Sequence, residues 1–356
     1  MADKGGAPME LMVRITKKLR SFTLQADFAV KDELLALLGA SGCGKSMTLK
    51  CIAGLETPDR GRIVLNGRVL YDSDKGINLS PQERKVGYLF QNYALFPNMT
   101  VAGNIAFVVS GNKAEKERKV QENLSRFKLQ ELAEAYPQEL SGGQQQRLAL
   151  ARIMAADNEL LLLDEPFSAL DSYLKWQMEM ELKCFLQDYN GAAVLVSHDR
   201  GEVYRLANRI AVINKGRMET VHTKQGLFKQ PDTLAAALLT GCKNVSAVRK
   251  MGNQRIYAVD WQLELDTDRP VSDKAAFAGI RAHFLVLREK VGDNTFAMDV
   301  VDVVEDVFSY LIMLRRKDSE ARPVRLEIPK AEWLQLGNPT EVNLYFPPNK
   351  IMLLER

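Results

Sequence analysis

The sequence predicts an α/β fold with a mixed sheet and a helical insert, followed by a small all-β domain of the OB type. Short, wholly apolar runs alternate with amphipathic helical patterns before residue 240, which is typical of strands wound with helices. Between residues 93 and 157 strand signals vanish, and apolar residues three and four apart predict helices. After Gly241 the chain changes to short β-like runs separated by Gly, Asn, Pro and Asp.

These changes predict two domains, at residues 1–240 and 241–356, with a helical subdomain at about 93–157. A chain of 356 residues is long enough for two or three domains. In the second domain we expect one small barrel, preceded by an irregular lead-in between residues 243 and 275.

Each element of the first domain follows from a local pattern. Residues 9 to 31 alternate between polar and apolar side chains on both sides of the basic KKLR, which predicts an antiparallel pair of strands. RIVLNGRVLY predicts a hairpin that turns at Asn66 and Gly67. The buried strands are expected in LLALL, VGYLFQ, ELLLLDEP and AAVLVSHD, with the helix YLKWQMEMELKCFLQDY before the last of them.

The first buried run, Leu34 to Leu38, leads into a loop with the spacing G-x-x-x-x-G-K-S. Glycines let the backbone N–H groups of such a loop surround a phosphate, and the helix that follows presents its positive end. Lys45 adds a mobile charge, and the Ser46 hydroxyl suits Mg²⁺. An ordinary Gly-rich turn is the alternative, but the strand before the loop and the helix after it favour a nucleoside triphosphate site.

Polar side chains stand at the ends of the three other buried strands: Gln91, the pair Asp164 and Glu165, and His198. Ligands of open α/β sheets bind at the carboxyl ends of strands. Asp164 suits a Mg²⁺-bound water, and Glu165 is placed to act as general base toward an attacking water. An acidic pair that caps a helix is the alternative interpretation.

The string LSGGQQQR predicts a second helix start suited to an anion. Ser141 is a good N-cap, Gly142 and Gly143 permit close backbone approach, and the helix from Gln144 turns its N–H groups toward a ligand. From the residues alone, an ordinary capped helix is the favoured interpretation, because S-G-G before a helix is common.

In this order the motifs resemble those of an ATP-binding cassette (ABC) protein over about the first 235 residues. They are Walker A at 39–46, the Q-loop at Gln91, the signature LSGGQ at 140–144, Walker B ending at Asp164, the D-loop SALD at 168–171 and the switch histidine His198. The resemblance implies a head-to-tail homodimer in which the signature of one subunit faces the P-loop of the other. It also implies that Gln91 senses Mg²⁺ and couples to a membrane partner, and that His198 contacts the γ-phosphate.

Such cassettes usually stack adenine on an aromatic residue before the P-loop, but the expected place holds Leu19, and Phe22 is the only close aromatic. The hypothesis assigns three kinds of role, with ATP and Mg²⁺ as cofactors. Catalytic roles go to Glu165, His198 and Gln91; Mg²⁺ contacts to Ser46, Gln91 and Asp164; and ATP contacts to Gly39, Ser41, Gly42, Cys43, Gly44, Lys45, Ser46, Met47, Ser141, Gly142, Gly143, Gln144, Asp171 and Phe22.

Similarity over longer stretches of sequence suggests a subfamily. The stretch from PDRGRIVLNG to QNYALFP is similar to the ATPase subunits of bacterial molybdate importers, and sulfate-type ATPases are nearly as close. The tail with GIRAHFLVL resembles the OB-like domain, of the TOBE or MOP type, that is appended to importer ATPases for oxyanions and sugars. The resemblance implies an ATPase that powers oxyanion import, with molybdate favoured over sulfate or thiosulfate, and a tail that braces the dimer or regulates it. A cassette that acts without a transporter is the alternative of a different class.

Composition and apolar run lengths exclude some classes of partner and of cellular location. A net charge of +3 without a long basic run argues against nucleic acid. No apolar run approaches the roughly twenty residues that span a bilayer, and the N-terminus lacks the apolar core of a signal peptide. Four scattered cysteines indicate reduced thiols. We therefore expect a soluble intracellular protein, peripheral to the cytoplasmic face of the membrane, that works with separate permease subunits and indirectly with a substrate-binding protein.

Overall fold

The computed structural model describes residues 10–168, 172–189 and 191–356, and the chain divides into two compact units, Met1–Lys224 and Gln225–Arg356. The division lies ahead of the domain boundary that the sequence predicts between residues 240 and 241. Helix α8 (Leu234–Leu239) explains the earlier position, since its Ala237 shares a small apolar cluster with Cys242, Met352 and Leu354 of the second unit.

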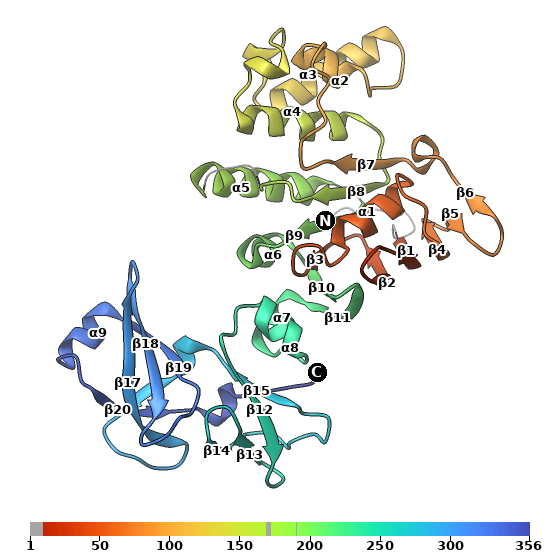
Figure 1. Cartoon of the computed structure of the whole chain (residues 1–356). Coiled ribbons are helices and arrows are strands. Elements are labelled where there is room, and N and C mark those ends of the chain that lie inside the picture. Colours follow the sequence, from red (N-terminus) through yellow and green to blue (C-terminus); the bar gives the residue numbers. More distant parts are fainter. Residues whose placement is uncertain (1–9, 169–171, 190) are drawn as a thin grey trace, which may run out of the picture. The chain divides into compact units, whose positions relative to one another are not determined.

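The first unit is built on one mixed sheet, and the predicted α/β class is confirmed (Figure 1). In the described residues the order of its eleven strands is β6-β5-β4-β1-β2-β11-β10-β3-β9-β8-β7. Their bounds are β1 (Glu10–Lys18), β2 (Thr23–Lys31), β3 (Leu34–Leu38), β4 (Arg60–Leu65), β5 (Arg68–Asp72), β6 (Ile77–Asn78), β7 (Val86–Leu89), β8 (Leu160–Asp164), β9 (Ala192–Ser197), β10 (Arg209–Asn214) and β11 (Arg217–Thr223).

The two halves of this sheet differ in direction. Strands β10, β3, β9, β8 and β7 pair in parallel with one another, whereas β2, β1, β4, β5 and β6 pair antiparallel with one another. Strand β11 lies between the two groups, antiparallel to β10 and parallel to β2. All residues of β3, β8 and β9 are buried, as expected for central parallel strands covered on both faces. The predicted antiparallel pair at residues 9 to 31 and the hairpin at Asn66 and Gly67 are present as β1–β2 and β4–β5.

Helix α1 (Lys45–Ala53) packs onto the sheet through Leu49 and Ile52, which share a buried cluster with Leu35 and Leu162. Its last carbonyls, those of Cys51 and Ile52, accept hydrogen bonds from the guanidinium of Arg84 at 2.9 and 2.8 Å. Arg84 is fully buried and also donates to the Leu79 carbonyl and to Oδ1 of Asn78. This side chain therefore joins the end of α1 to the segment before β7.

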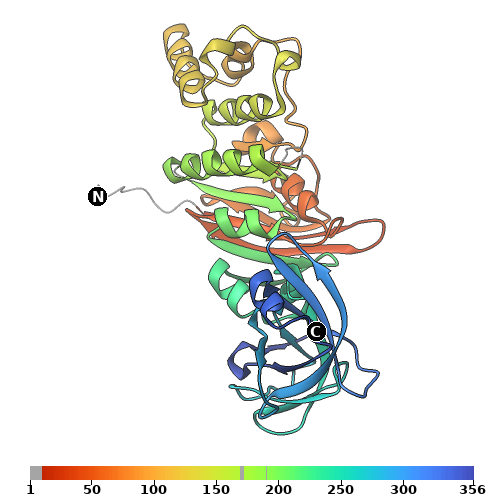
Figure 2. The same cartoon turned by 90° about the vertical axis from the view of Figure 1, so that its left-hand side faces the viewer.

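The predicted helical insert forms a group of its own within the first unit. Figures 1 and 2 show helices α2, α3 and α4 gathered at one end of the unit, and β7 is the strand nearest to them. Each starts with a side-chain cap, at Thr100, Asn112 and Ser141 respectively. The remaining helices of the unit, α5 and α6, precede and follow β9. The bounds are α2 (Val101–Ala106), α3 (Lys113–Arg126), α4 (Gly142–Ala155), α5 (Ser172–Asp188) and α6 (Arg200–Leu206).

The second unit contains two five-stranded sheets in its described residues, in the orders β14-β13-β12-β15-β21 and β16-β20-β17-β18-β19. Their inner faces contribute to one apolar cluster that includes Trp261, Trp333 and Phe346. The bounds are α7 (Lys224–Lys229), β12 (Asn244–Lys250), β13 (Arg255–Ala258), β14 (Leu263–Asp266), β15 (Phe277–Ile280), β16 (Val286–Arg288), β17 (Thr295–Glu305), β18 (Ser309–Arg316), β19 (Val324–Pro329), α9 (Lys330–Gln335), β20 (Glu341–Tyr345) and β21 (Met352–Leu354).

The β structure predicted after residue 241 is confirmed, but the irregular lead-in expected between residues 243 and 275 is wrong. That stretch holds β12, β13 and β14. Strand β12 pairs with β15 through residues 244–247 and with β13 through residues 248–250, so it is a full member of a sheet. Whether such a segment forms a strand depends strongly on the strands with which it pairs, and less on its own sequence.

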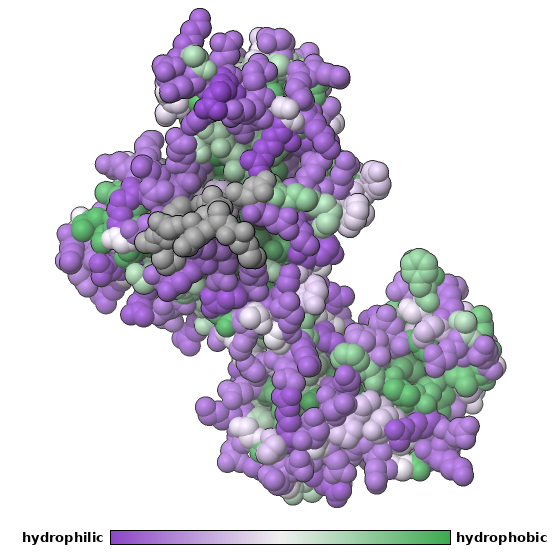
Figure 3. All heavy atoms as spheres, turned by 180° about the vertical axis from the view of Figure 1, so that it is seen from behind, coloured by the Kyte–Doolittle hydropathy of each residue, from purple (hydrophilic) through white to green (hydrophobic). Residues whose placement is uncertain are grey.

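Apolar side chains are exposed on the β17–β18 hairpin and beside it, and the space-filling view shows apolar surface over this part of the second unit (Figure 3). They are Val301, Val303, Val304, Val307, Phe308, Leu334 and Leu336. Within the described ranges, every helix is too short or too polar to cross a membrane.

Candidate functional site

The loop between β3 and α1 has the backbone of a phosphate cradle. Gly42 and Gly44 have φ angles of 76° and 108°, a region that only glycine adopts without strain. The Lys45 ammonium is buried and donates to the carbonyl oxygens of Gly39 at 2.8 Å and Ala40 at 3.0 Å. An ammonium has three donors, so these two bonds leave one for a phosphate oxygen. The loop thus has the conformation and the charge that an anion needs.

Oxygen ligands suited to Mg²⁺ meet where α1 begins and β8 ends. The Ser46 hydroxyl donates to Oδ1 of Asp164 at 2.7 Å, and the Tyr88 hydroxyl donates to Oδ2 of Asp164 at 2.8 Å. A hydroxyl and a carboxylate are ligands that Mg²⁺ accepts. Burial, together with the charge of Asp164, raises the pKa of Tyr88, which therefore remains a hydrogen-bond donor. The residues present fit a Mg²⁺ ion beside the cradle.

Parallel pairing of β8 with β9 brings the predicted catalytic side chains together. Asp164 lies opposite Val196, and the Glu165 N–H continues the ladder with a 2.9 Å bond to the Val196 carbonyl. Glu165 has a φ of 46°, which directs the chain away from the sheet. Oε2 of Glu165 lies 3.3 Å from Nδ1 of His198.

Gln91 joins the same group through Ser168. The Gln91 amide donates to the Ser168 hydroxyl at 3.3 Å, and that hydroxyl donates to the Glu165 carbonyl at 3.1 Å. A small pocket of about 100 Å³ adjoins these residues. Its lining consists of Glu165, Phe167, Ser168, Lys175, Ser197, His198 and Glu202.

The predicted N-cap of α4 is present. The Ser141 hydroxyl accepts a bond from the Gln144 N–H, and the Gln144 side chain accepts one from the Ser141 N–H at 2.8 Å. Ser141 and Gly142 are exposed, whereas Gly143 is buried against Leu174, whose methyl carbon would lie 3.0 Å from a Cβ at this glycine. Among the described residues, no hydrogen bond or ion pair joins this helix start to the cradle. Its exposure leaves it accessible to another molecule.

The remaining predicted ATP contacts differ in what their side chains do. The Cys43 thiol is buried, and burial raises its pKa, while Met47 packs against the core. Only the backbone of these two residues can therefore serve the cradle. Ser41 is exposed. Asp171 lies outside the described residues.

Phe22 lies beside the cradle. A Cβ on Gly44 would lie 3.6 Å from Cε2 of Phe22, and a Cβ on Gly216 would lie 2.3 Å from Cδ2 of Phe22. The Phe22 ring thus covers Gly216, in the turn between β10 and β11. A residue larger than glycine at position 216 would displace the ring. Half-buried and next to the phosphate loop, the ring is placed to contact a base.

Two side chains near the site have no sequence signal of their own. Tyr88 reaches Asp164 because β7 pairs with β8, opposite Leu162. Lys175 reaches the pocket from α5. The alternating burial of β7 is a local pattern, but the partner of its tyrosine depends on the strand order.

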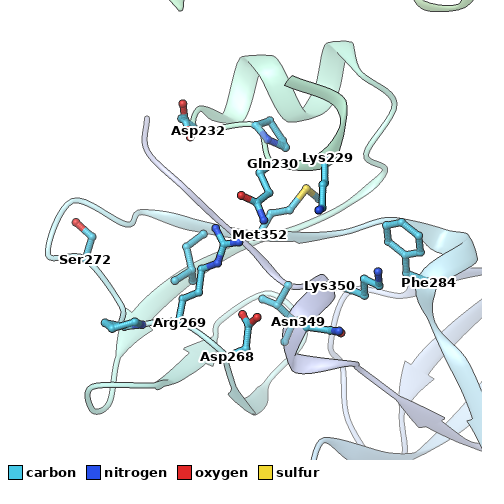
Figure 4. Close-up of a pocket in the computed structure, with 14 residues that line it drawn as sticks. Lys229, Gln230, Asp232, Asp268, Arg269, Ser272, Phe284, Asn349, Lys350 and Met352 are labelled. Carbon is cyan, nitrogen blue, oxygen red and sulfur yellow. The ribbon is translucent and has the colours of Figure 1, made fainter. Parts of the chain in front are cut away.

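A larger pocket, of about 260 Å³, lies within the second unit (Figure 4). Lys229, Arg269 and Lys350 bring positive charge to it, and Asp232 and Asp268 bring negative charge. Lys350 lies 4.8 Å from the centre of the Phe284 ring. Because charges of both signs line this pocket, its electrostatics do not select an oxyanion.

In comparisons with known proteins, a family model and full-length relatives point to the same family. The family model described as ABC transporter matches residues 24–168. The sulfate/thiosulfate import ATP-binding protein CysA of Mannheimia succiniciproducens is 34% identical over 337 residues, which are 92% of this chain and 92% of that protein. The spermidine/putrescine import ATP-binding protein PotA of Rubrobacter xylanophilus is 35% identical over 336 residues, 89% of this chain and 86% of that protein.

A solved structure shares the fold. The structure of cbiO1 from Clostridium perfringens, described as part of the ABC transporter complex cbiONQ, matches with a TM-score of 0.54 and 22% identity. The match covers 62% of this chain and 90% of that chain. At this identity the likeness supports the fold of the first unit alone.

Proposed function

Because the chain belongs to the family of ABC transporter ATP-binding subunits, as its full-length relative at 34% identity shows, we propose that it powers import of a tetrahedral oxyanion. The proposed protein is the ATP-hydrolysing subunit of a bacterial importer, on the cytoplasmic face of the membrane. The proposal of ATP hydrolysis rests on one observation. At the carboxyl ends of the central strands, Ser46 contacts Asp164, and Glu165 contacts His198.

ATP and Mg²⁺ are the cofactors of this family, and the chain's residues fit both. Lys45 and the N–H groups of its loop bind the phosphates, while Ser46 and Asp164 hold the ion. Bound Mg²⁺ supplies positive charge that offsets the charge developing on the transferred phosphoryl group. Glu165 accepts a proton from the attacking water, and His198, at 3.3 Å, holds the orientation of that carboxylate.

We propose that the complete site needs two copies of the chain. Exposed Ser141 and Gly142, at the start of α4, would complete the γ-phosphate site of the other copy. ATP-binding subunits of this family work with permease subunits, and the helical insert is the segment that we assign to that contact. Gln91, bonded to Ser168, connects the insert with the catalytic group.

The oxyanion rests on likeness over both units. The CysA relative named for sulfate and thiosulfate aligns with 92% of the chain, and the residues before the Q-loop favour molybdate. Sulfate and molybdate share tetrahedral geometry and a double negative charge. The second candidate is a polyamine, favoured by the PotA relative that aligns with 89% of the chain.

The test is reconstitution of the full chain with its permease in vesicles, followed by ATP hydrolysis in the presence of candidate binding proteins. We expect binding proteins loaded with sulfate, thiosulfate or molybdate to stimulate hydrolysis, and the active one identifies the cargo. Stimulation only by a spermidine-loaded protein would overturn the oxyanion assignment. Lys45→Ala, which removes the phosphate-binding charge, is the inactive control. Failure to co-purify with any permease would favour a cassette that acts without a transporter.

A further inference from the structure

A partly buried ionic cluster links helix α5 to the start of α6, next to the catalytic group. Nζ of Lys175 lies 2.6 Å from Oδ2 of Asp199 and 3.5 Å from Oε2 of Glu202. Lys175 is on the first turn of α5, Asp199 is the N-cap of α6, and Glu202 is in the first turn of α6. A second pair, Arg205 with Glu179 at 2.9 Å, joins the same two helices.

Asp199 follows His198 in the chain and fixes the backbone there. Its Oδ1 accepts hydrogen bonds from the N–H groups of Gly201 at 2.8 Å and Glu202 at 3.1 Å, and its own N–H donates to the Ser197 hydroxyl at 2.9 Å. Burial opposes ionisation, but the Lys175 bond and these N–H donors lower the pKa of Asp199 to about 2. Asp199 is therefore charged at neutral pH, and Lys175 holds it in place.

Glu202 faces the catalytic pocket. It is 3% exposed, and it lines the pocket of about 100 Å³ together with Glu165 and His198. Its Oε1 has no hydrogen-bond partner in the described part of the chain. A buried polar atom of this kind costs free energy unless a water or a ligand group satisfies it. The pocket has room for water between Glu202 and the catalytic pair.

Resting on the proposed function, we propose that Lys175 is a positioning residue for ATP hydrolysis. Through Asp199 and Glu202 it fixes the turn that carries His198, and thereby the orientation of His198 toward the Glu165 carboxylate. It contacts neither the cradle nor its glycines, so its effect falls on turnover and not on nucleotide affinity.

The alternative is that the cluster only stabilises the packing of α5 on α6. These roles differ in what they change. A purely structural lysine would lower the free energy of unfolding and leave kcat of the folded protein unaltered, whereas a misplaced His198 lowers kcat in protein that is folded and binds ATP. Misplacement by about 1 Å can reduce a rate about a hundredfold.

The test compares Lys175→Met with Lys175→Arg in the full chain at pH 8. We expect Lys175→Met to reduce kcat by about tenfold to a hundredfold, with the ATP dissociation constant changed by less than about twofold. Lys175→Arg should restore most of the rate, because a guanidinium can donate to both carboxylates. Lys183→Met, an exposed lysine on the same helix, is the matched control and should behave as the wild type.

Glu202→Gln provides a second variant of nearly the same shape, should Lys175→Met fail to fold. It loses the ion pair with Lys175 and keeps the Asp199 contact, so we expect a smaller fall in kcat with unchanged ATP affinity. A Lys175→Met protein with wild-type kcat, or one that Lys175→Arg does not rescue, overturns the positioning role. A wild-type chain without Mg²⁺-dependent hydrolysis would instead overturn the proposed function, and the inference with it.

Discussion

The Ser46 hydroxyl donates a 2.7 Å hydrogen bond to Oδ1 of Asp164 across 118 positions of the chain. Ser46 is in the first turn of α1 and Asp164 ends β8, so this bond joins the phosphate cradle to the carboxyl end of β8. The Tyr88 hydroxyl, donating to the other carboxylate oxygen, keeps Asp164 in one orientation. We predict that Mg²⁺ binds at this pair.

Asp164→Asn should separate Mg²⁺ use from nucleotide binding. An amide carries no charge to hold the ion, so we expect Mg²⁺-dependent hydrolysis to fall at least about a hundredfold, while ATP binding in EDTA is retained by Lys45. The measurements are steady-state hydrolysis and fluorescent-nucleotide binding with and without Mg²⁺. Tyr88→Phe, which keeps the carboxylate, should lose less than about tenfold. Equal hydrolysis by Asp164→Asn and wild type would refute the metal role.

Glu165→Gln should trap the ATP-bound dimer. The amide keeps the size of the side chain but cannot accept a proton, so we expect hydrolysis to fall about a hundredfold or more while ATP still binds. Size-exclusion chromatography with light scattering should then show a dimer in Mg²⁺-ATP that ADP does not produce. Near-normal turnover of this variant would remove Glu165 from the role of general base.

Phe22→Ala tests the base contact. The ring lies beside Gly44, so we expect its loss to weaken ATP binding by about tenfold, the typical scale of one aromatic stack. Inorganic triphosphate, which has no base, should bind both proteins equally and serves as the control ligand. If ATP affinity is unchanged in the variant, Phe22 does not contact adenine.

The elements of the first unit were predictable because their signals are local. The buried run before Gly39 and the glycine spacing that follows specify strand, loop and helix within sixteen residues of sequence. The run RIYAVDW, which contains β13, is recognisable as β-like, but the joining of β12 to β14 into one sheet with β15 was not predictable, since it depends on a strand order that no local pattern encodes. Tyr88 and Lys175 likewise acquire their neighbours from strand order and helix packing, which no local pattern encodes.

Arg84→Met should destabilise the fold without touching the site. Four acceptors, among them the last carbonyls of α1, would lose a buried guanidinium. We expect the free energy of unfolding of the first unit to fall by about 3–5 kcal/mol, measured by urea denaturation followed through tryptophan fluorescence and circular dichroism. Arg62→Met, which removes an exposed arginine paired with Asp72, should cost less than about 1 kcal/mol. Equal losses in the two variants would show that the burial of Arg84 is unimportant.

Glu202 should make the free energy of unfolding depend on pH at values above the ordinary pKa of a glutamate. Burial raises its pKa from 4.5 to about 7, against the opposing charge of Lys175. Below pH 4.5 the carboxyl is protonated in both the folded and the unfolded chain. As the pH rises toward 7 the unfolded chain ionises first, so the folded state loses roughly 3 kcal/mol of relative stability.

Glu202→Gln cannot ionise and should not show this loss. We therefore expect the free energy of unfolding of the variant, relative to wild type, to increase between pH 5 and pH 8. Asp199, with its pKa lowered to about 2, contributes its own pH dependence only at more acid pH, so it does not obscure this window. Urea denaturation of both proteins at half-unit intervals measures the difference. Parallel stability curves across the window would mean that Glu202 ionises at its ordinary pKa.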